Sequence, residues 1–135
     1  MKTLWLICGA PGTGKSHLAL ILAKDLPGDT VVLSADDYFT NPVTGEYTFA
    51  FLELKRAHRD CRARTEYHMS YECENVIVHN TFTQHWERAP YYNLAERYGY
   101  FVQSVHLRNI RPEGDIHNVP IAKVDQLSGR HEFTS

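Results

Sequence analysis

The feature that most constrains the fold is an apolar run that leads directly into a glycine-rich loop. Residues 4–8 read Leu-Trp-Leu-Ile-Cys, and residues 9–16 read Gly-Ala-Pro-Gly-Thr-Gly-Lys-Ser. The run has the length and composition of a buried strand. After the loop, an apolar stripe at helical spacing continues until Pro27 ends the pattern. The sequence therefore predicts a strand, a tight turn and a helix that begins near Lys15.

The loop also has the Gly-x-x-x-x-Gly-Lys-Ser spacing of the Walker A phosphate-binding motif. In that motif, glycines let backbone N–H groups turn toward phosphate oxygens, lysine reaches the β and γ phosphates, and serine ligates Mg²⁺. We therefore predict that Lys15 acts in catalysis and that Ser16 binds the metal. A glycine-rich turn that binds nothing is the alternative. The residues expected to hold ATP are Gly9, Ala10, Pro11, Gly12, Thr13, Gly14, Lys15, Ser16 and His17.

Three further apolar runs have strand length and are separated by helical patterns. The runs cover residues 31–33, 76–78 and 101–105, and the two later helices are expected at about 49–69 and 83–98. In the last helix, Pro90 implies a first-turn position, a kink or a break. The alternation predicts a three-layer α/β fold, with a mainly parallel sheet and helices on both faces. Ligands of such folds bind beyond the carboxyl ends of the strands.

Length and composition suit one domain over residues 1–135, with a possible lid or tail from about residue 108. The net charge of -2 gives no overall attraction to nucleic acid or to an acidic membrane. Three cysteines, an odd number, suit buried reduced thiols and point to the cytoplasm. No apolar run is long enough for a membrane span, so we expect no membrane contact. The oligomeric state stays open.

Two carboxylates follow the second predicted strand, at Asp36 and Asp37. This position places an acid on the same sheet edge as the phosphate loop. We predict that Asp36 accepts the proton of an attacking hydroxyl or orients it, and that Asp36 also helps to bind Mg²⁺. Asp37 is a candidate substrate contact, although it could instead cap the following turn. An Asx turn is the alternative for either residue.

His79 and Asn80 end the third predicted strand at the same edge. Many P-loop proteins carry there an aspartate that holds magnesium through water, but this chain has no carboxylate at that position. We predict that His79 and Asn80 contact the acceptor or the γ phosphate. A satisfied polar turn is the alternative for both.

Basic residues lie close together in the second predicted helix, one flank of which could follow a nucleic-acid backbone. They are Lys55, Arg56, Arg59, Arg62 and Arg64. The alternative is a solvated face whose charges pair with Glu53, Asp60 and Glu66. After the last clear strand, a closing lid could bring an arginine onto the transferring phosphoryl group. Arg111 is the candidate catalytic arginine and Arg108 a candidate substrate contact, with ordinary surface arginines as the alternative.

With these residues in place, the chain resembles small P-loop kinases of the polynucleotide kinase type. In particular it resembles the kinase module of the Nedd4-binding-protein family and its free-standing bacterial and phage relatives. The stretches that carry the resemblance are residues 9–16, residues 33–39, Tyr47-Thr-Phe49 with Ala57-His58 and Cys61, and residues 79–87. Together they extend over nearly the whole chain.

The resemblance implies a three-layer P-loop NTPase fold with the sheet order 2-3-1-4-5. It also implies transfer of the ATP γ phosphate to a hydroxyl, often at the 5′ end of a nucleic acid. By position it assigns Lys15 and Ser16 to nucleotide and metal, and Asp36 to activation of the hydroxyl. The expected cofactors are therefore ATP and Mg²⁺, and the expected partner is a nucleic-acid or nucleotide-like acceptor.

The chain departs from the family at His79, where an aspartate is usual, and at Phe82, where an asparagine is usual. The segment from Arg108 to Val119 is also shorter. We predict an ATP-dependent kinase that acts on the 5′-hydroxyl of a nucleic acid or of a nucleotide-like acceptor. The same fold could instead phosphorylate a nucleoside, a modified DNA base or a small metabolite. The departures also leave open a nucleotide-binding regulatory or partner-binding module with lost or altered chemistry.

Overall fold

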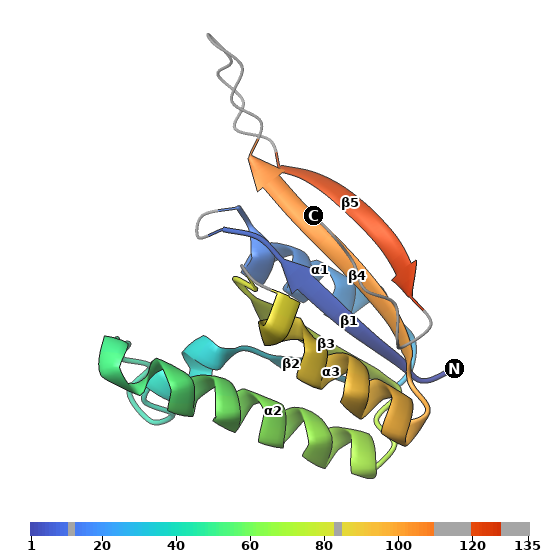
Figure 1. Ribbon diagram of the computed structural model, residues 1–135. Coiled ribbons are helices and arrows are strands. Elements are labelled where there is room, and N and C mark those ends of the chain that lie inside the picture. The colour runs from blue at the N-terminus through green and yellow to red at the C-terminus, as the bar shows by residue number, and fades with distance from the viewer. Residues whose placement is uncertain (11–12, 83–84, 110–119, 128–135) are drawn as a thin grey trace, which may run out of the picture.

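The strands and helices alternate along the chain as the apolar runs predict (Figure 1). The computed structural model describes residues 1–10, 13–82, 85–109 and 120–127. In chain order the elements are β1 (Thr3–Cys8), α1 (Lys15–Asp25), β2 (Thr30–Leu33), the 3-10 helices η1 (Ala35–Phe39) and η2 (Phe51–Glu53), α2 (Leu54–Ser70), β3 (Asn75–Asn80), α3 (His85–Tyr98), β4 (Phe101–Asn109) and β5 (Pro120–Leu127).

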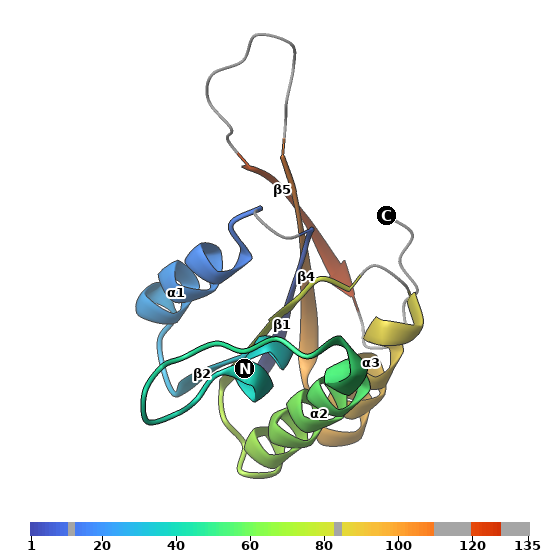
Figure 2. The same cartoon turned by 90° about the vertical axis from the view of Figure 1, so that its left-hand side faces the viewer.

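The strands form one sheet in the order β2-β3-β1-β4-β5. The first four strands run parallel, whereas β5 pairs antiparallel with β4. Helix α1 covers one face of the sheet, and α2 and α3 cover the other (Figure 2). The predicted three-layer α/β class is therefore confirmed, and so is the strand order that the resemblance implies.

The register brings the ends of the central strands level with one another. Cys8, the last residue of β1, lies opposite Asn80 of β3 and His106 of β4. The loops after β1 and β3 therefore leave the sheet at the same edge, and η1 follows the end of the neighbouring strand β2. This carboxyl edge is where such sheets bind their ligands.

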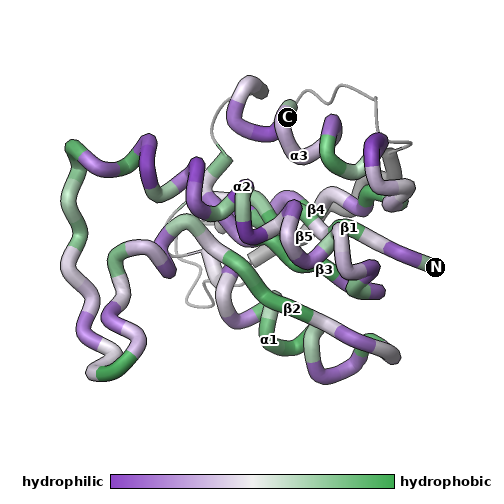
Figure 3. Tube along the Cα trace, turned by 90° about the horizontal axis from the view of Figure 1, so that it is seen from below, coloured by the Kyte–Doolittle hydropathy of each residue, from purple (hydrophilic) through white to green (hydrophobic). Residues whose placement is uncertain are grey.

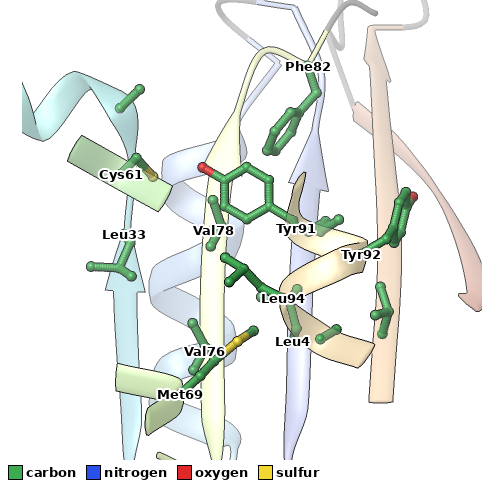
Figure 4. Close-up of a cluster of buried hydrophobic side chains, with 14 of the residues drawn as sticks. Leu4, Leu33, Cys61, Met69, Val76, Val78, Phe82, Tyr91, Tyr92 and Leu94 are labelled. Atoms are coloured by element: carbon green, nitrogen blue, oxygen red, sulfur yellow. The ribbon is translucent and has the colours of Figure 1, made fainter. Parts of the chain in front are cut away.

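Alternate side chains of the central strands supply two cores, one on each face of the sheet. Leu6 belongs to the core beneath α2 and α3, and the next residue, Ile7, belongs to the core beneath α1. In the larger core the hydroxyl of Tyr91 points toward Cys61 of α2, and Phe82 packs edge-on against the Tyr91 ring (Figure 4). Figure 3 shows β2 as mostly hydrophobic, whereas hydrophobic and hydrophilic residues alternate along α2, which has one solvent-exposed side.

The helix bounds differ from the predicted ones mainly at the helix starts. The first helix begins at Lys15 as predicted. The second was expected from about residue 49, but it begins at Leu54 after the short turn Phe51–Glu53. Pro90 lies inside α3, in its second turn. A proline there cannot donate the helical hydrogen bond to residue 86, yet the helix continues past it.

The end of the chain contains a strand that the sequence did not reveal. We expected a lid or tail from about residue 108, but β4 continues to Asn109 and Pro120–Leu127 pair with it as β5. Residues 120–127 thus form an edge strand, and such a strand leaves a weaker apolar pattern in the sequence than a buried strand does. The lid or tail stays a prediction. Residues 110–119 and 128–135 lie outside the described residues.

The described helices include none that is long and apolar enough to cross a membrane. All three cysteines are free, with Cys8 and Cys61 buried and Cys73 partly exposed. The expectation of unpaired thiols is confirmed. A cytoplasmic location stays a prediction.

Candidate active site

The loop after β1 is shaped by two glycines whose positions tolerate no other residue easily. Gly14 has a φ of 91° and caps α1, which begins at the next residue; this left-handed conformation favours glycine. A Cβ atom on Gly9 would lie 2.6 Å from the Thr13 hydroxyl and 3.0 Å from the Leu107 carbonyl oxygen. The backbone therefore packs closely at both ends of the loop, and its middle residues, Pro11 and Gly12, lie outside the described residues.

Lys15 lies over this loop rather than in open solvent. Its ammonium group donates a 3.1 Å hydrogen bond to the Ala10 carbonyl, which also accepts a 2.7 Å bond from the Thr13 hydroxyl. Burial lowers the pKa of Lys15, and the Asp36 carboxylate partly offsets that lowering. Ser16 is exposed in the first turn of α1. The N-terminus of a helix, a nearby ammonium group and a serine hydroxyl together suit an anionic ligand.

Asp36 lies at the same edge of the sheet, one residue into η1. Its carboxylate accepts a 3.2 Å hydrogen bond from the hydroxyl of Tyr47, which follows in the connection between η1 and η2. The pKa values of Lys15 and His79 are both lowered by burial, and the Asp36 charge raises both in part. The structure therefore brings Asp36 near both Lys15 and His79, as the topology predicted.

Asp37 serves a different purpose from its neighbour. Its carboxylate accepts a 3.0 Å hydrogen bond from the backbone N–H of Ser34, and the Ser34 side chain caps η1 in return. The same carboxylate forms a 3.1 Å ion pair with Arg64 of α2. The structure thus favours the capping alternative for Asp37, because its oxygen atoms hold the start of η1.

His79 and Asn80 point to opposite faces of β3. The Asn80 side chain is buried, and its oxygen accepts a 2.8 Å hydrogen bond from the Ala35 backbone. Asn80 therefore ties the end of β2 to β3, which is the polar-turn alternative. His79 is only partly buried, and burial lowers its pKa, which the Asp37 carboxylate partly offsets.

Three of the predicted site residues are not brought into this cluster by any described contact. His17 is exposed on α1. Arg108 is exposed near the end of β4, two residues beyond the position level with Cys8. Arg111 lies outside the described residues. Their roles stay predictions.

Sequence reasoning missed the residues that position Asp36. Ser34 caps η1, and Arg64 donates a 2.9 Å hydrogen bond to the Ser34 carbonyl besides its pair with Asp37. A sequence signal for the cap existed, because Ser34 and Asp37 have the serine-x-x-acid spacing of a capping box. The contact of Tyr47 with Asp36 left no such signal, because it depends on how a long connection folds back.

The phosphate loop between β1 and α1, in a sheet of this order, defines a P-loop kinase-like domain. The family model described as AAA domain matches residues 4–109, and the chain belongs to this family.

Two individual proteins show the same relationship. NEDD4-binding protein 2 from Homo sapiens is 38% identical over 99 residues, which is 73% of this chain but only 5% of that protein. A solved structure of the Pnkp1/Rnl/Hen1 complex contains a chain that superposes with a TM-score of 0.62 and 17% identity, over 89% of this chain and 45% of that one. The resemblance to polynucleotide-kinase-like proteins is therefore confirmed, and the second match supports the fold.

Proposed function

We propose that this chain is an ATP-dependent kinase that transfers the γ phosphate to the 5′-hydroxyl of a nucleic acid or of a nucleotide-like acceptor. The observation that carries the proposal is the meeting of Lys15 and Asp36 at one sheet edge, where the charge of Asp36 acts on the Lys15 ammonium group. A cation for the phosphates and a carboxylate for the hydroxyl thus lie at the same sheet edge, close enough to interact electrostatically. The choice of acceptor rests on the membership of the family and on the relatives described above.

In the proposed reaction the acceptor oxygen attacks the γ phosphorus, and the bond from that phosphorus to the β–γ bridging oxygen breaks, so that ADP leaves. The hydroxyl proton passes to the carboxylate of Asp36. The ammonium group of Lys15 exchanges its bond to the Ala10 carbonyl for the oxygens of the β and γ phosphates. Tyr47 keeps the Asp36 carboxylate oriented.

Mg²⁺ fits this arrangement through Ser16 and Asp36, whose hydroxyl and carboxylate oxygens are the ligands that this hard cation prefers. Within the described ranges, three or more His, Cys, Asp or Glu side chains nowhere gather into a metal-binding group. The nucleotide phosphates would therefore supply much of the coordination. When bound, the ion neutralises charge that develops on the transferring phosphoryl group.

The test is incubation with γ-labelled ATP and Mg²⁺ against 5′-hydroxyl DNA, 5′-hydroxyl RNA, nucleosides and hydroxymethylated DNA. Lys15→Ala should abolish tight ATP binding, whereas Asp36→Asn should retain binding and lower kcat by about 10²- to 10⁴-fold. Asp25→Asn removes a carboxylate at the far end of α1 and is the matched control. An Asp36→Asn variant with the turnover of the wild type would exclude Asp36 as the base.

A second candidate function is a nucleotide-binding regulatory module with altered chemistry, which the imidazole of His79 in place of a carboxylate favours. In that case the protein binds ATP, but no acceptor in the panel becomes labelled. His79→Asp then restores the usual acidic residue, and His79→Asn is its uncharged control. Transfer that appears only in His79→Asp would identify His79 as the cause of the loss.

A further inference from the structure

A groove separates the first turns of α2 from the first turn of α3, on the face of the sheet opposite α1. It encloses about 490 Å³. Phe51, Leu52 and Trp86 line it, and these residues are 73%, 94% and 62% exposed. Large apolar side chains with that much exposure, gathered around one hollow, indicate a binding surface.

The same groove is strongly basic. Lys55, Arg59 and Arg62 line it, against a single carboxylate from Glu87. In the part of the chain that the structure describes, none of these three cations pairs with a carboxylate. A protein of net charge -2 thus concentrates unpaired positive charge at one place beside exposed rings. This combination suits a polyanion with flat apolar groups better than it suits an apolar helix.

The groove adjoins a second hollow between α2 and α3. This hollow of about 360 Å³ shares Arg59 and Arg62 with the groove and extends to Arg97. The two helices lie side by side on this face of the sheet (Figures 1 and 2). A ligand can therefore extend from the groove along the helix pair past Arg59 and Arg62, whereas Arg97 already forms a 3.0 Å ion pair with Glu66, which lines the same hollow.

One residue that lines the groove, His58, lies within electrostatic reach of the candidate active site. The charges of both Glu87 and Asp36 act on its imidazole. The hydroxyl of Tyr38 in η1 donates a 3.0 Å hydrogen bond to Glu53 in η2, which joins the segment of Asp36 to the start of α2. A chain that occupies the groove can thus present its end to Asp36.

We propose that this groove holds the acceptor strand as single-stranded nucleic acid, with bases on Trp86 and Phe51 and phosphates on Arg59 and Arg62. The inference rests on the proposed function for the identity of the acceptor. Bases reach aromatic side chains only when they are unstacked, which selects single strands over duplexes. The basic residues of α2 thereby have two roles. Arg56 pairs with Glu53, and Arg64 pairs with Asp37. Arg59 and Arg62 line the groove and would contact the nucleic-acid strand.

The experiment measures binding apart from phosphoryl transfer. A 3′-fluorescein oligothymidylate of about eight nucleotides, within the site sizes known for such surfaces, is titrated with protein without ATP and followed by anisotropy. Trp86→Ala should weaken binding about tenfold, and Trp86→Phe should retain most of it, because a ring remains for stacking. Binding to the wild type should also quench the fluorescence of Trp86, leaving the signal of Trp5 in the sheet.

Removal of charge gives an independent readout. A plot of log affinity against log salt concentration falls with a slope of about -0.7 for each phosphate contact with a single strand. The double variant Arg59→Ala/Arg62→Ala loses two such contacts, so its plot should be shallower by about 1.4. Arg56→Ala removes one positive charge from the same helix outside the groove, and we expect this variant to bind within about twofold of the wild type. Under turnover, the groove variants should raise the KM for the oligonucleotide about tenfold and leave the KM for ATP unchanged.

Each result bears on the groove and on the kinase separately. If the groove variants bind the oligonucleotide as tightly as the wild type, the inference is overturned, even where phosphoryl transfer proceeds. Polyglutamate is also titrated as a competing ligand. If it binds as tightly as the oligonucleotide, through the same arginines and without quenching of Trp86, the partner is an acidic peptide and the inference is overturned. Groove-dependent binding without transfer to any acceptor supports the groove as a single-strand site and overturns the proposed kinase.

Discussion

The hydroxyl of Tyr47 donates a 3.2 Å hydrogen bond to a carboxylate oxygen of Asp36, although eleven positions separate the two residues. The contact depends on a connection that folds back on itself. Thr40 and Tyr47 form an isolated antiparallel bridge, and the Tyr47 ring packs edge-on against Phe39. The connection thus holds a phenol against the carboxylate that we propose as the base. Tyr47 is a positioning residue, because it acts through Asp36.

Tyr47→Phe should lower kcat by about three- to tenfold, which corresponds to loss of one hydrogen bond to a charged group. The ring stays, so its packing on Phe39 and the fold are preserved. The KM for ATP should not change, because Tyr47 bonds the proposed base, whereas we assign ATP to the phosphate loop. Steady-state kinetics measure both constants. Tyr67→Phe, at an exposed position on α2, is the control; an equal loss in both variants would count against positioning by Tyr47.

Gly9→Ala should damage the phosphate loop. The new Cβ would lie 2.6 Å from the Thr13 hydroxyl and 3.0 Å from the backbone oxygen of Leu107, so that the loop or β4 must shift. Overpacking of this kind costs about 1–3 kcal/mol. Urea unfolding and ATP binding should both show the loss. In the double variant Gly9→Ala/Thr13→Ala one of the two clashes disappears, so its destabilisation should be less than the sum of the single ones; a purely additive result would contradict the clash.

The free energy of unfolding should fall as the pH drops from 7.5 to 5.5. Burial lowers the pKa values of His58, His68 and His79 below their ordinary value of 6.5. The unfolded chain therefore binds more protons than the folded one below about pH 6.5. Stability is fully present above that pH and is lost below it, by at most about 1.4 kcal/mol per pH unit for each histidine.

Denaturation of His79→Gln by urea at several pH values tests the contribution of one of these histidines. Glutamine cannot titrate, so the variant should show a shallower dependence on pH than the wild type. The same slope in both proteins would show that His79 is not responsible. Because the test reads stability, it does not depend on catalysis.

The sequence predicted those parts of the fold that depend on local pattern. The run from Leu4 to Cys8 is apolar because β1 is the central strand and is covered on both faces, which leaves a strong signal. The glycines and Lys15 follow it at fixed spacing. Strand β5 left no comparable signal, because a strand at the end of the sheet order, paired with β4 alone, needs no continuous apolar run. For this reason we expected a lid or tail where a strand lies.

Around the candidate site, prediction succeeded where topology alone brings residues together and failed where a side chain has a competing partner. Asp36 follows β2 and His79 lies near the end of the neighbouring strand β3, so their proximity could be foreseen. Asp37 and Asn80 occupy the same strand ends, yet their polar atoms bind Ser34 and Ala35. No spacing rule distinguishes a carboxylate that faces a ligand from one that caps a turn.

Arg64→Ala should destabilise the protein and displace the proposed base. The Arg64 guanidinium bonds Asp60 at 2.9 Å, Asp37 at 3.1 Å and the Ser34 carbonyl at 2.9 Å, so that one side chain of α2 fixes the junction of β2 and η1. The group is partly exposed, and loss of its bonds should cost about 1–2 kcal/mol.

The control for Arg64→Ala is Arg56→Ala, which removes an exposed arginine whose ion pair with Glu53 spans 3.9 Å. That change should cost less than about 0.5 kcal/mol. Urea unfolding compares the two variants, and transfer to the acceptor measures the effect on Asp36. In Arg64→Ala, kcat should fall under conditions where the protein remains folded, because η1 carries Asp36 with it when its junction loosens. Equal stability and equal kcat in the two variants would show that Arg64 does not hold Asp36 in place.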